Sequence, residues 1–483
     1  MALWGEQIFG SVNLGDKRLD DRLIDLVERF VERPEAPIPM ACGTWAATVA
    51  AYRFFGHSSI SPEAITECLA SGTVNRCAGQ PVILAVQDTT SLDFSTHSKT
   101  TGLGSLEQPD LRGLFLHTTL AVTPDGVPLG VLDQQMWARD PEHPGTRHRR
   151  KHVPVEGKES RKWLDGLRRT EARLNSLGRV VTIADREADV YELFALAQEL
   201  HGDWLIRARH DRAVERSNDR LRSVVEHAPV DLTLTIEVPR STRGPRTATV
   251  EVRRARALLV PPPRAKVAHD HWWAHHPKAE RLVPRDLPPL SVGVVLVSEP
   301  DPPPGEAPLR WLLITNLLVE TPEAAVQCVE WYCQRWKIEQ FHYVLKSGCH
   351  VERLQLDRVD RLKRALALYS AVAWALLYLT YRARMDPTAP CTTVLDDESW
   401  QALWTFCYPA APLPTEPLSL HQAIILIARL GGFLARKHDG HPGVKTTWRG
   451  LTRLSDILAT WRILTRSPDP PPSSHLTLAT AHV

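Results

Sequence analysis

Two short apolar runs that each lead into an aspartate limit the possible folds more than any other feature. Residues 82–86 are apolar and are followed by Asp88, and residues 180–184 are mostly apolar and lead directly into Asp185. A run of this length is typical of a buried strand, and an acid at its exit lies at the edge of the sheet. A single aspartate in such a place is more often a helix cap or turn former. The pair therefore predicts a mixed α/β fold and only raises the question of a site.

The elements around these runs favour one kind of sheet. Residues 114–132, LFLHTTLAVTPDGVPLGVL, predict a hairpin that turns at Pro124-Asp125-Gly126. Residues 158–177 predict a helix that Gly178 ends. The resulting order of three strands, a helix and a strand is that of a ribonuclease H-like sheet.

The stretch WYCQRWKIEQFHYVLK, residues 331–346, predicts a helix with one polar face. Spacings of three, four and seven residues put four side chains at about 0°, −60°, −20° and −40° around the helix axis; they are Tyr332, Arg335, Glu339 and Lys346. The opposite flank is apolar and is expected to be buried; it consists of Ile338, Phe341, Val344 and Leu345. Thr321 and Pro322 predict where the helix begins, and Gly348 predicts where it ends. Such a polar face is commonly plain solvated surface, and the alternative is that it lines a cleft.

The presence of three acids, in the order Asp88, Asp185 and Glu339, favours the interpretation that the polar helix face lines a cleft. Two carboxylates at strand ends and a third on a flanking helix form a known layout for a pair of divalent cations about 3.5–4 Å apart. Hard cations such as Mg²⁺ take oxygen ligands. The sequence therefore predicts a metal site built from these carboxylates.

With these acids and this polar helix face, the chain resembles a DDE transposase of the insertion-sequence-four family, in the Tn5-like group. The signature Tyr-x2-Arg-x3-Glu-x6-Lys of that group is matched by the four polar side chains of residues 331–346. Similarity also covers AVQDTTSL around Asp88, ADREADV around Asp185 and GEAPLRWLLITN around Trp311. It extends to LGDKR at residues 14–18, AYRFF at residues 51–55 and IARLGGF at residues 427–433. The matches occur in the same order over nearly the whole chain.

The resemblance implies cut-and-paste transposition of an insertion sequence by hydrolysis and strand transfer, with a DNA hairpin between. It implies that Asp88, Asp185 and Glu339 are the catalytic and metal-binding residues for two Mg²⁺ ions, for which Mn²⁺ can substitute. Double-stranded DNA at the transposon ends and target is the expected partner, bound by a homodimer. The expected DNA-binding residues are Tyr332, Arg335, Lys346, Trp311, Lys17 and Arg18. Without the resemblance, Trp311 at the start of an apolar strand is most simply a core residue.

The expected domains follow from these patterns and from the resemblance. Residues 1–76 form a helical domain that binds DNA ends, and residues 77–384 form the ribonuclease H-like catalytic domain. A β-rich insertion interrupts the catalytic domain at about residues 203–310. Within it HDHWWAHHPK, residues 269–278, is interpreted as an irregular surface loop, with a metal site as the alternative. Residues 385–483 form a helical C-terminal region for dimerisation, with a disordered end from Ser467.

The distribution of charge supports DNA binding in two segments of the chain and argues against it at the N-terminus. The net charge is only +2, but residues 139–173 hold 11 Lys or Arg against 6 Asp or Glu, and residues 330–364 hold 8 against 5. Basic excess suits a polyanionic partner. The segment RHRRKH, residues 147–152, is an additional candidate for DNA contact. Residues 1–75 hold 6 basic against 10 acidic side chains, which argues against a strongly electrostatic N-terminal grip on DNA.

Cysteine use and hydropathy bear on where the protein works. The eight cysteines are scattered without metal-ligand spacing, which predicts free thiols in a reducing compartment, the cytoplasm. The resemblance implies that the protein is nucleoid-associated when bound to DNA. Residues 365–381 are apolar, and we interpret them as a core helix rather than a membrane span.

Two other functions fit the same residues. A ribonuclease H-like nuclease that cuts without joining would use the same three acids. An inactive, transposase-derived DNA-binding protein would tolerate the loss of one of them, and all three are present.

Overall fold

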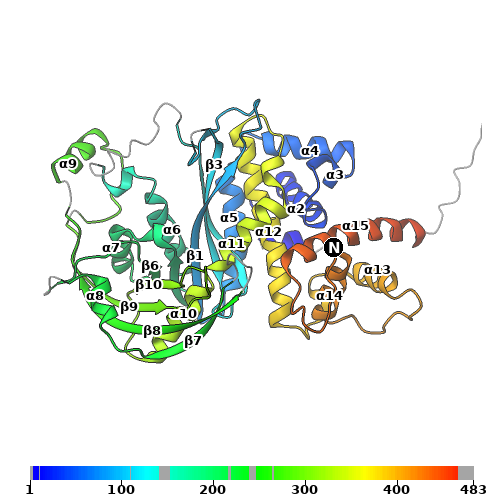
Figure 1. Cartoon of the computed structure of the whole chain (residues 1–483). Coiled ribbons are helices and arrows are strands. Elements are labelled where there is room, and N and C mark those ends of the chain that lie inside the picture. The colour runs from blue at the N-terminus through cyan, green and yellow to red at the C-terminus, as the bar shows by residue number, and fades with distance from the viewer. Residues whose placement is uncertain are drawn as a thin grey trace, which may run out of the picture.

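The computed structural model describes residues 4–9, 11–108, 110–140, 153–215, 219–238, 246–263, 266–284 and 286–465 of the chain. A β-sheet with both parallel and antiparallel strands, together with the helices that cover it, occupies the centre and one side of the molecule. Helices from both ends of the chain gather on the other side (Figure 1). The segment at residues 147–152 and the end from Ser467 both lie outside the described residues.

The N-terminal region is a bundle of helices with side-chain caps. It contains α1 (Trp4–Phe9), α2 (Lys17–Glu32), α3 (Ile38–Cys42), α4 (Trp45–Gly56) and α5 (Pro62–Cys77). The side chains of Asp16, Thr44 and Ser61 accept hydrogen bonds from backbone N–H groups in the first turns of α2, α4 and α5. The helical N-terminal domain expected from the sequence is thus present in these residues.

Five strands form the central part of the sheet, in the order β4, β3, β1, β5, β6. Strand β1 (Val82–Asp93) pairs antiparallel with β3 (Arg112–Val122), which pairs antiparallel with β4 (Pro128–Trp137). On its other side β1 runs parallel to β5 (Arg179–Ala184), which runs parallel to β6 (Asp203–Arg207). The two-residue strand β2 (Gly104–Ser105) adds to β3. The predicted hairpin is confirmed, and Gly126 at its turn has a φ of 91°, which favours glycine.

Helix α6 (Arg161–Leu174) leads from β4 to β5, and α7 (Tyr191–Glu199) connects the parallel strands β5 and β6. Between β5 and α7 lies a short 3-10 turn, Arg186–Ala188. A second 3-10 turn, Val155–Gly157, precedes α6. The apolar runs that predicted β1 and β5 are buried, with Leu84, Val86, Val181 and Ile183 fully inaccessible.

The residues between β6 and α10 extend the same sheet. Strands β7 (Leu232–Val238), β8 (Arg246–Leu259), β9 (Leu290–Ser298) and β10 (Arg310–Thr315) continue from β6 in the order β10, β9, β8, β7, all antiparallel. Helix α8 (Leu221–Glu226) packs on β8 and β9. The sheet therefore reaches ten strands.

The expectation of an irregular loop at residues 269–278 is wrong over most of its length. Helix α9 (Lys266–His275) covers residues up to His275. The reason is local: imidazole Nδ1 atoms of His275 and His276 lie 2.8 Å from the carbonyl oxygens of His271 and Trp272, four residues earlier. The ring of Trp272 also stacks on His276, with centroids 4.1 Å apart.

The predicted helix at residues 331–346 is broken into three pieces. Helix α10 (Pro322–Cys333) ends before Gln334, α11 (Trp336–Tyr343) follows, and a π-helical turn, Val344–Gly348, completes the run. At the break, the N–H groups of Gln334 and Arg335 donate to carbonyls only three residues earlier, so the chain is wound more tightly there. The predicted cap at Thr321 is confirmed, because its side chain accepts from the N–H of Ala324.

Helix α12 (Val359–Met385) is the longest helix of the fold and runs through its core. By length and composition it could cross a membrane, but 83% of its apolar window is buried inside the protein. It contacts α2 and α4 from the N-terminal bundle and α14 (Leu420–Leu430) and α15 (Val444–Thr465) from the C-terminal region. The latter region also contains α13 (Asp397–Cys407). All eight cysteines are free thiols, as predicted.

The two ends of the chain meet beside the π-helical turn. The indole N–H of Trp448 on α15 donates to Glu35 Oε1 over 2.6 Å. The same indole ring lies against Gly348, where an added Cβ would come within 3.1 Å of it. Arg33 forms an ion pair with Asp456 of α15 at 2.8 Å. These contacts join the N-terminal bundle, the C-terminal helices and the segment that carries Lys346.

Candidate active site

The strand register places Asp88 and Asp185 side by side. Gln87 of β1 is opposite Ala184 of β5 in a parallel pair, so the next residue along each chain is an aspartate. Both acids therefore sit where these parallel strands exit the buried part of the sheet. Asp185 also caps the turn after β5, since its Oδ1 accepts from the N–H of Glu187 at 2.8 Å.

Glu339 reaches the same region from α11, which packs against β1. Its Oε1 accepts a hydrogen bond from Arg335 at 2.5 Å, and the two side chains are 28% and 17% exposed. The buried flank predicted for this helix is confirmed, because Ile338, Phe341, Val344 and Leu345 are inaccessible.

The pKa of Asp88 reports how close the three acids are in electrostatic terms. Burial, and then the negative charge of Asp185, raise the pKa of Asp88 to about 7, with a smaller contribution from Glu339 in the same direction. A hydrogen bond from the Thr89 backbone and the charge of Arg335 lower it. The three carboxylates thus repel one another across a common space, and a divalent cation would relieve that repulsion.

The three carboxylates are suitable ligands for a hard cation, although their side chains do not surround a common metal position in this structure. Among the described residues, no group of three or more His, Cys, Asp or Glu side chains is arranged to hold a metal ion. Asp88, Asp185 and Glu339 nevertheless offer only carboxylate oxygens, which are the ligands that Mg²⁺ and Mn²⁺ prefer. The negative charges of Asp185 and Glu339, which raise the pKa of Asp88, are the kind of repulsion that a bound divalent cation relieves.

Two side chains beside the acids were not predicted. His342, one turn after Glu339, is buried with its Nδ1 3.8 Å from Asp88 Oδ2. Lys162 at the start of α6 is 12% exposed and lies 3.6 Å from Glu187, and burial lowers its pKa while Glu187, Glu159 and Asp88 raise it. The i, i+3 spacing from Glu339 was the available signal for His342. Only the packing of α6 onto the sheet reveals Lys162.

Tyr332 and Trp311 form a pair next to Arg335. Their rings meet edge to face, with centroids 5.0 Å apart and an interplanar angle of 66°. The expectation that the phenol of Tyr332 looks into a cleft is wrong, because the residue is 4% exposed and burial raises its pKa. Trp311 covers it from β10 and is itself only partly buried. The Arg335 guanidinium lies 5.9 Å from the centre of the Tyr332 ring.

Lys346 lies on the π-helical turn, beyond the acids. Its Nζ is 3.7 Å from Glu352 Oε1, and the same oxygen accepts from the N–H of Asp93 at the end of β1 over 2.9 Å. The lysine side chain is 30% exposed. The sequence signature therefore converges on one side of the sheet, with Tyr332 as support and Arg335, Glu339 and Lys346 accessible.

Three protein-family models match successive parts of the chain. Residues 1–60 match the transposase DNA-binding family, residues 143–376 match the transposase DDE domain, and residues 371–467 match the transposase Tn5 dimerisation domain.

The chain belongs to the Tn5-like DDE transposases.

This transposase is therefore an enzyme of the polynucleotidyl transferase and endonuclease class. It acts on DNA, carries a dimerisation domain and depends on divalent metal, as its DDE domain implies. The match to the DDE domain begins at residue 143, so it includes Asp185 and Glu339 but not Asp88. For Asp88 the argument rests on the β1–β5 register.

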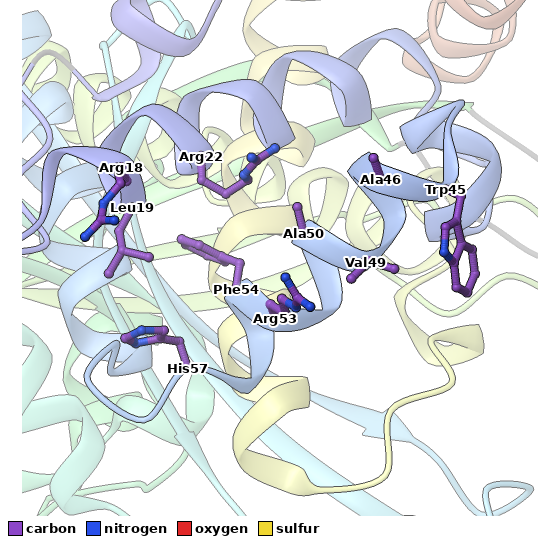
Figure 2. A pocket seen from close by; sticks show the side chains of 10 residues that line it. All are labelled: Arg18, Leu19, Arg22, Trp45, Ala46, Val49, Ala50, Arg53, Phe54 and His57. Atoms are coloured by element: carbon purple, nitrogen blue, oxygen red, sulfur yellow. The ribbon is translucent and has the colours of Figure 1, made fainter.

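The N-terminal bundle of the transposase has a basic hollow between α2 and α4, shown in Figure 2. Its volume is about 590 Å³, and its rim carries three arginines and an exposed tryptophan; the polar and aromatic lining consists of Arg18, Arg22, Arg53, His57, Trp45 and Phe54. Trp45 is 80% exposed. Arg18 is also exposed and pairs with Asp16 at 3.1 Å, while Lys17 next to it is exposed. The acids that dominate the charge count of this region thus leave one basic surface.

Proposed function

We propose that this transposase excises and inserts its element by cut-and-paste, at a site formed by Asp88, Asp185 and Glu339. The observation that carries the assignment is the register of β1 and β5, together with the raised pKa of Asp88. These carboxylates would hold two Mg²⁺ ions, or Mn²⁺ in their place. When bound, such ions stabilise the charge on the attacking and leaving oxygens of a phosphodiester.

The proposal includes a ribonuclease H-like catalytic domain. Its support is the strand order β4, β3, β1, β5, β6, with three antiparallel strands followed by two parallel ones. We place this domain at residues 77–384, with the β-rich insertion, expected from the sequence at about residues 203–310, starting only after β6 ends at Arg207. The DNA-end-binding bundle takes residues 1–76, the dimerising helices take residues 385–483, and the protein works in the cytoplasm on nucleoid DNA.

Arg335 and Lys346 are the proposed phosphate contacts of the active site. A guanidinium can bind a phosphate through two parallel N–H groups, and an ammonium acts as a point charge. Tyr332 is too buried to meet DNA directly in this conformation, so its proposed role is to support Arg335 and Trp311 from below.

The DNA end is proposed to cross the hollow between α2 and α4. Arg18, Arg22 and Arg53 line it, and Lys17 is the exposed residue next to Arg18 in the chain. Phosphate contacts by these side chains would give affinity that falls with salt. The exposed indole of Trp45 supplies an apolar face at the same rim.

Cutting both strands at one site is proposed to proceed through a hairpin. After water cleaves the first strand, its free 3′ hydroxyl attacks a phosphodiester of the opposite strand; the new bond closes the hairpin, and the flanking DNA leaves as the displaced strand end. Water then opens the hairpin and regenerates the 3′ hydroxyl for joining, so one active site can process both strands. The sharp bend is relieved if a base leaves the stack, and stacking on an aromatic ring contributes roughly 1–3 kcal/mol per base. Trp311 is the aromatic side chain proposed for this role.

The test is cleavage and joining of labelled end DNA in Mg²⁺. Asp88→Asn, Asp185→Asn and Glu339→Gln should each reduce nicking by at least a thousandfold while DNA binding persists. Asp203→Asn is the matched control, because this acid lies at the start of β6, away from the strand exits, and pairs with Arg179 at 2.5 Å. Nicking by Asp185→Asn at the wild-type rate would refute the site. Cleavage by the wild type without joining would favour a plain nuclease.

A further inference from the structure

We propose that His342 is a positioning residue whose imidazole N–H orients the Asp88 carboxylate toward the divalent cation. This inference rests on the proposed function, because it assumes that Asp88 binds the metal. It concerns a residue outside the four-residue signature.

The position of His342 is fixed by the same helix that carries Glu339. It lies three residues later on α11, and its side chain is only 7% exposed. Its Nδ1 is 3.8 Å from Asp88 Oδ2. This distance is about 0.6–1.1 Å beyond the range of an N–H···O hydrogen bond, so the two groups face each other without yet bonding. Catalytic hydrogen bonds are often long before substrate or metal arrives and tighten afterwards.

The surroundings decide which ring nitrogen carries the hydrogen. A lone pair on Nδ1 would face a carboxyl oxygen and repel it, so the tautomer with hydrogen on Nδ1 is favoured. The other nitrogen, Nε2, is buried and has no hydrogen-bond partner among the described residues. That nitrogen therefore carries the lone pair. The single donor of the ring points at Asp88.

The His342 ring is buried, with only 7% of its side chain exposed, and burial favours the neutral form of an imidazole, which suits a role beside a metal ligand. A charged partner such as Arg335 neutralises the acid that it holds and competes with a cation. A neutral N–H orients the carboxylate and leaves its negative charge available.

Asp88 has little else to hold it. Among the described residues no side chain donates a hydrogen bond to its carboxylate, and the remaining donor is the backbone N–H of Thr89. The neighbouring side chains on β1, Gln87 and Thr89, point to the other face of the strand, where they bond to His117 at 3.1 and 2.9 Å. His117 in turn meets Trp163 edge on, with ring centroids 4.6 Å apart. His117 thus holds the side chains on one face of β1 by hydrogen bonds. On the other face, His342 is the side chain that can orient the carboxylate of Asp88.

The experiment replaces the ring by side chains that keep or lose the donor. In His342→Asn the amide N–H takes a place near Nδ1, in His342→Gln it is displaced by one methylene, and in His342→Leu it is lost. Mn²⁺ binding to the full-length metal-free protein is measured by calorimetry, and nicking of end DNA is followed against Mg²⁺ concentration. Loss of a group that orients a metal ligand typically weakens metal affinity by about 10–100-fold.

We expect His342→Leu and His342→Gln to raise the Mn²⁺ dissociation constant and the half-activating Mg²⁺ concentration by about tenfold or more. His342→Asn should recover most of that loss, and thermal unfolding without metal should differ little between the Asn and Gln variants. If His342→Leu fails to fold, the contrast between Asn and Gln still decides. Equal metal affinity in Asn and Gln variants of equal thermal stability would overturn the positioning role. Absence of metal-dependent nicking in the wild type would instead overturn the proposed function.

Discussion

Arg335 donates a hydrogen bond over 2.5 Å to the carboxylate of Glu339, which lies four residues later in the chain and beside the two aspartates. One of the three acids is therefore already paired with a cation that belongs to the protein. A divalent ion at Glu339 must compete with this guanidinium, and DNA phosphate is the group that can draw the guanidinium away. Binding of DNA and binding of metal are expected to favour each other through this pair.

Replacing Arg335 by Ala should separate these two effects. Loss of one phosphate contact should weaken end-DNA binding and reduce the slope of log K against log salt by about one. Mn²⁺ affinity in the absence of DNA should stay equal or rise, since Glu339 loses its competitor. Arg382→Ala is the matched control, because it removes a similar helical pair with Asp386 at 2.7 Å. An unchanged salt slope for Arg335→Ala would leave only a structural role for the pair.

The raised pKa of Asp88 predicts that the metal-free protein loses stability as the pH rises. With a pKa of about 7 in the folded state, the folded protein holds this proton more tightly than the unfolded chain does. The contribution of this group to stability is complete below about pH 4 and is lost as the pH passes about 7.

Asp88→Asn cannot ionise, so it removes that loss. In chelator at pH 8 the variant should be more stable than the wild type by roughly 2–4 kcal/mol, and near pH 4 the two should agree. Added Mg²⁺ should narrow the gap at pH 8, because only the wild type offers the full set of carboxylates. Denaturant unfolding at both pH values measures this. A gap of the same size at pH 4 and pH 8 would show that Asp88 is not the titrating group.

Trp311→Ala should uncouple nicking from hairpin formation. The variant keeps all three acids, so nicked DNA should accumulate while hairpin falls by roughly tenfold, in line with the loss of one base-stacking contact. Trp311→Phe retains a ring and should restore much of the hairpin. Denaturing gels of labelled end DNA separate nicked from hairpin products. An equal fall in both products would mean that the residue acts only by packing on Tyr332.

The hollow between α2 and α4 should set affinity for the DNA end without affecting the chemistry. Arg22→Ala and Arg53→Ala should each weaken end binding by about 3–30-fold and reduce the salt slope, while cleavage at saturating DNA stays near normal. Arg462→Ala is the control, since Arg462 pairs with Glu398 at 2.8 Å in the C-terminal region. Binding isotherms at several salt concentrations give the result. Wild-type affinity in both hollow variants would place the DNA elsewhere on the bundle.

The sequence predicted those parts of the site that depend on short-range patterns. Asp88 and Asp185 could be placed because each follows a run that can only be a buried strand, and parallel neighbours bring such exits together. The burial of Tyr332 could not be predicted, because it comes from Trp311 on a strand of the insertion. The break at Gln334 is equally invisible, since every residue there can continue a helix. The proposed role of His342 could not be predicted either, because it depends on a contact with Asp88 on β1, some 250 residues earlier in the chain.

The continuous pairing of β6, β10, β9, β8 and β7 has a consequence for anyone who shortens this protein. Strand β10 is hydrogen-bonded to β6 along one edge and to β9 along the other. A deletion that removed β7 to β9 would leave a row of bare N–H and C=O groups on a mostly apolar strand, and such an edge recruits strands from other molecules. A trimmed version is therefore expected to precipitate or form aggregates unless its open edge is given charged residues, since removing β10 as well would only move the open edge to β6. We therefore expect β7 to β9 to be needed for solubility, whatever they contribute to handling DNA.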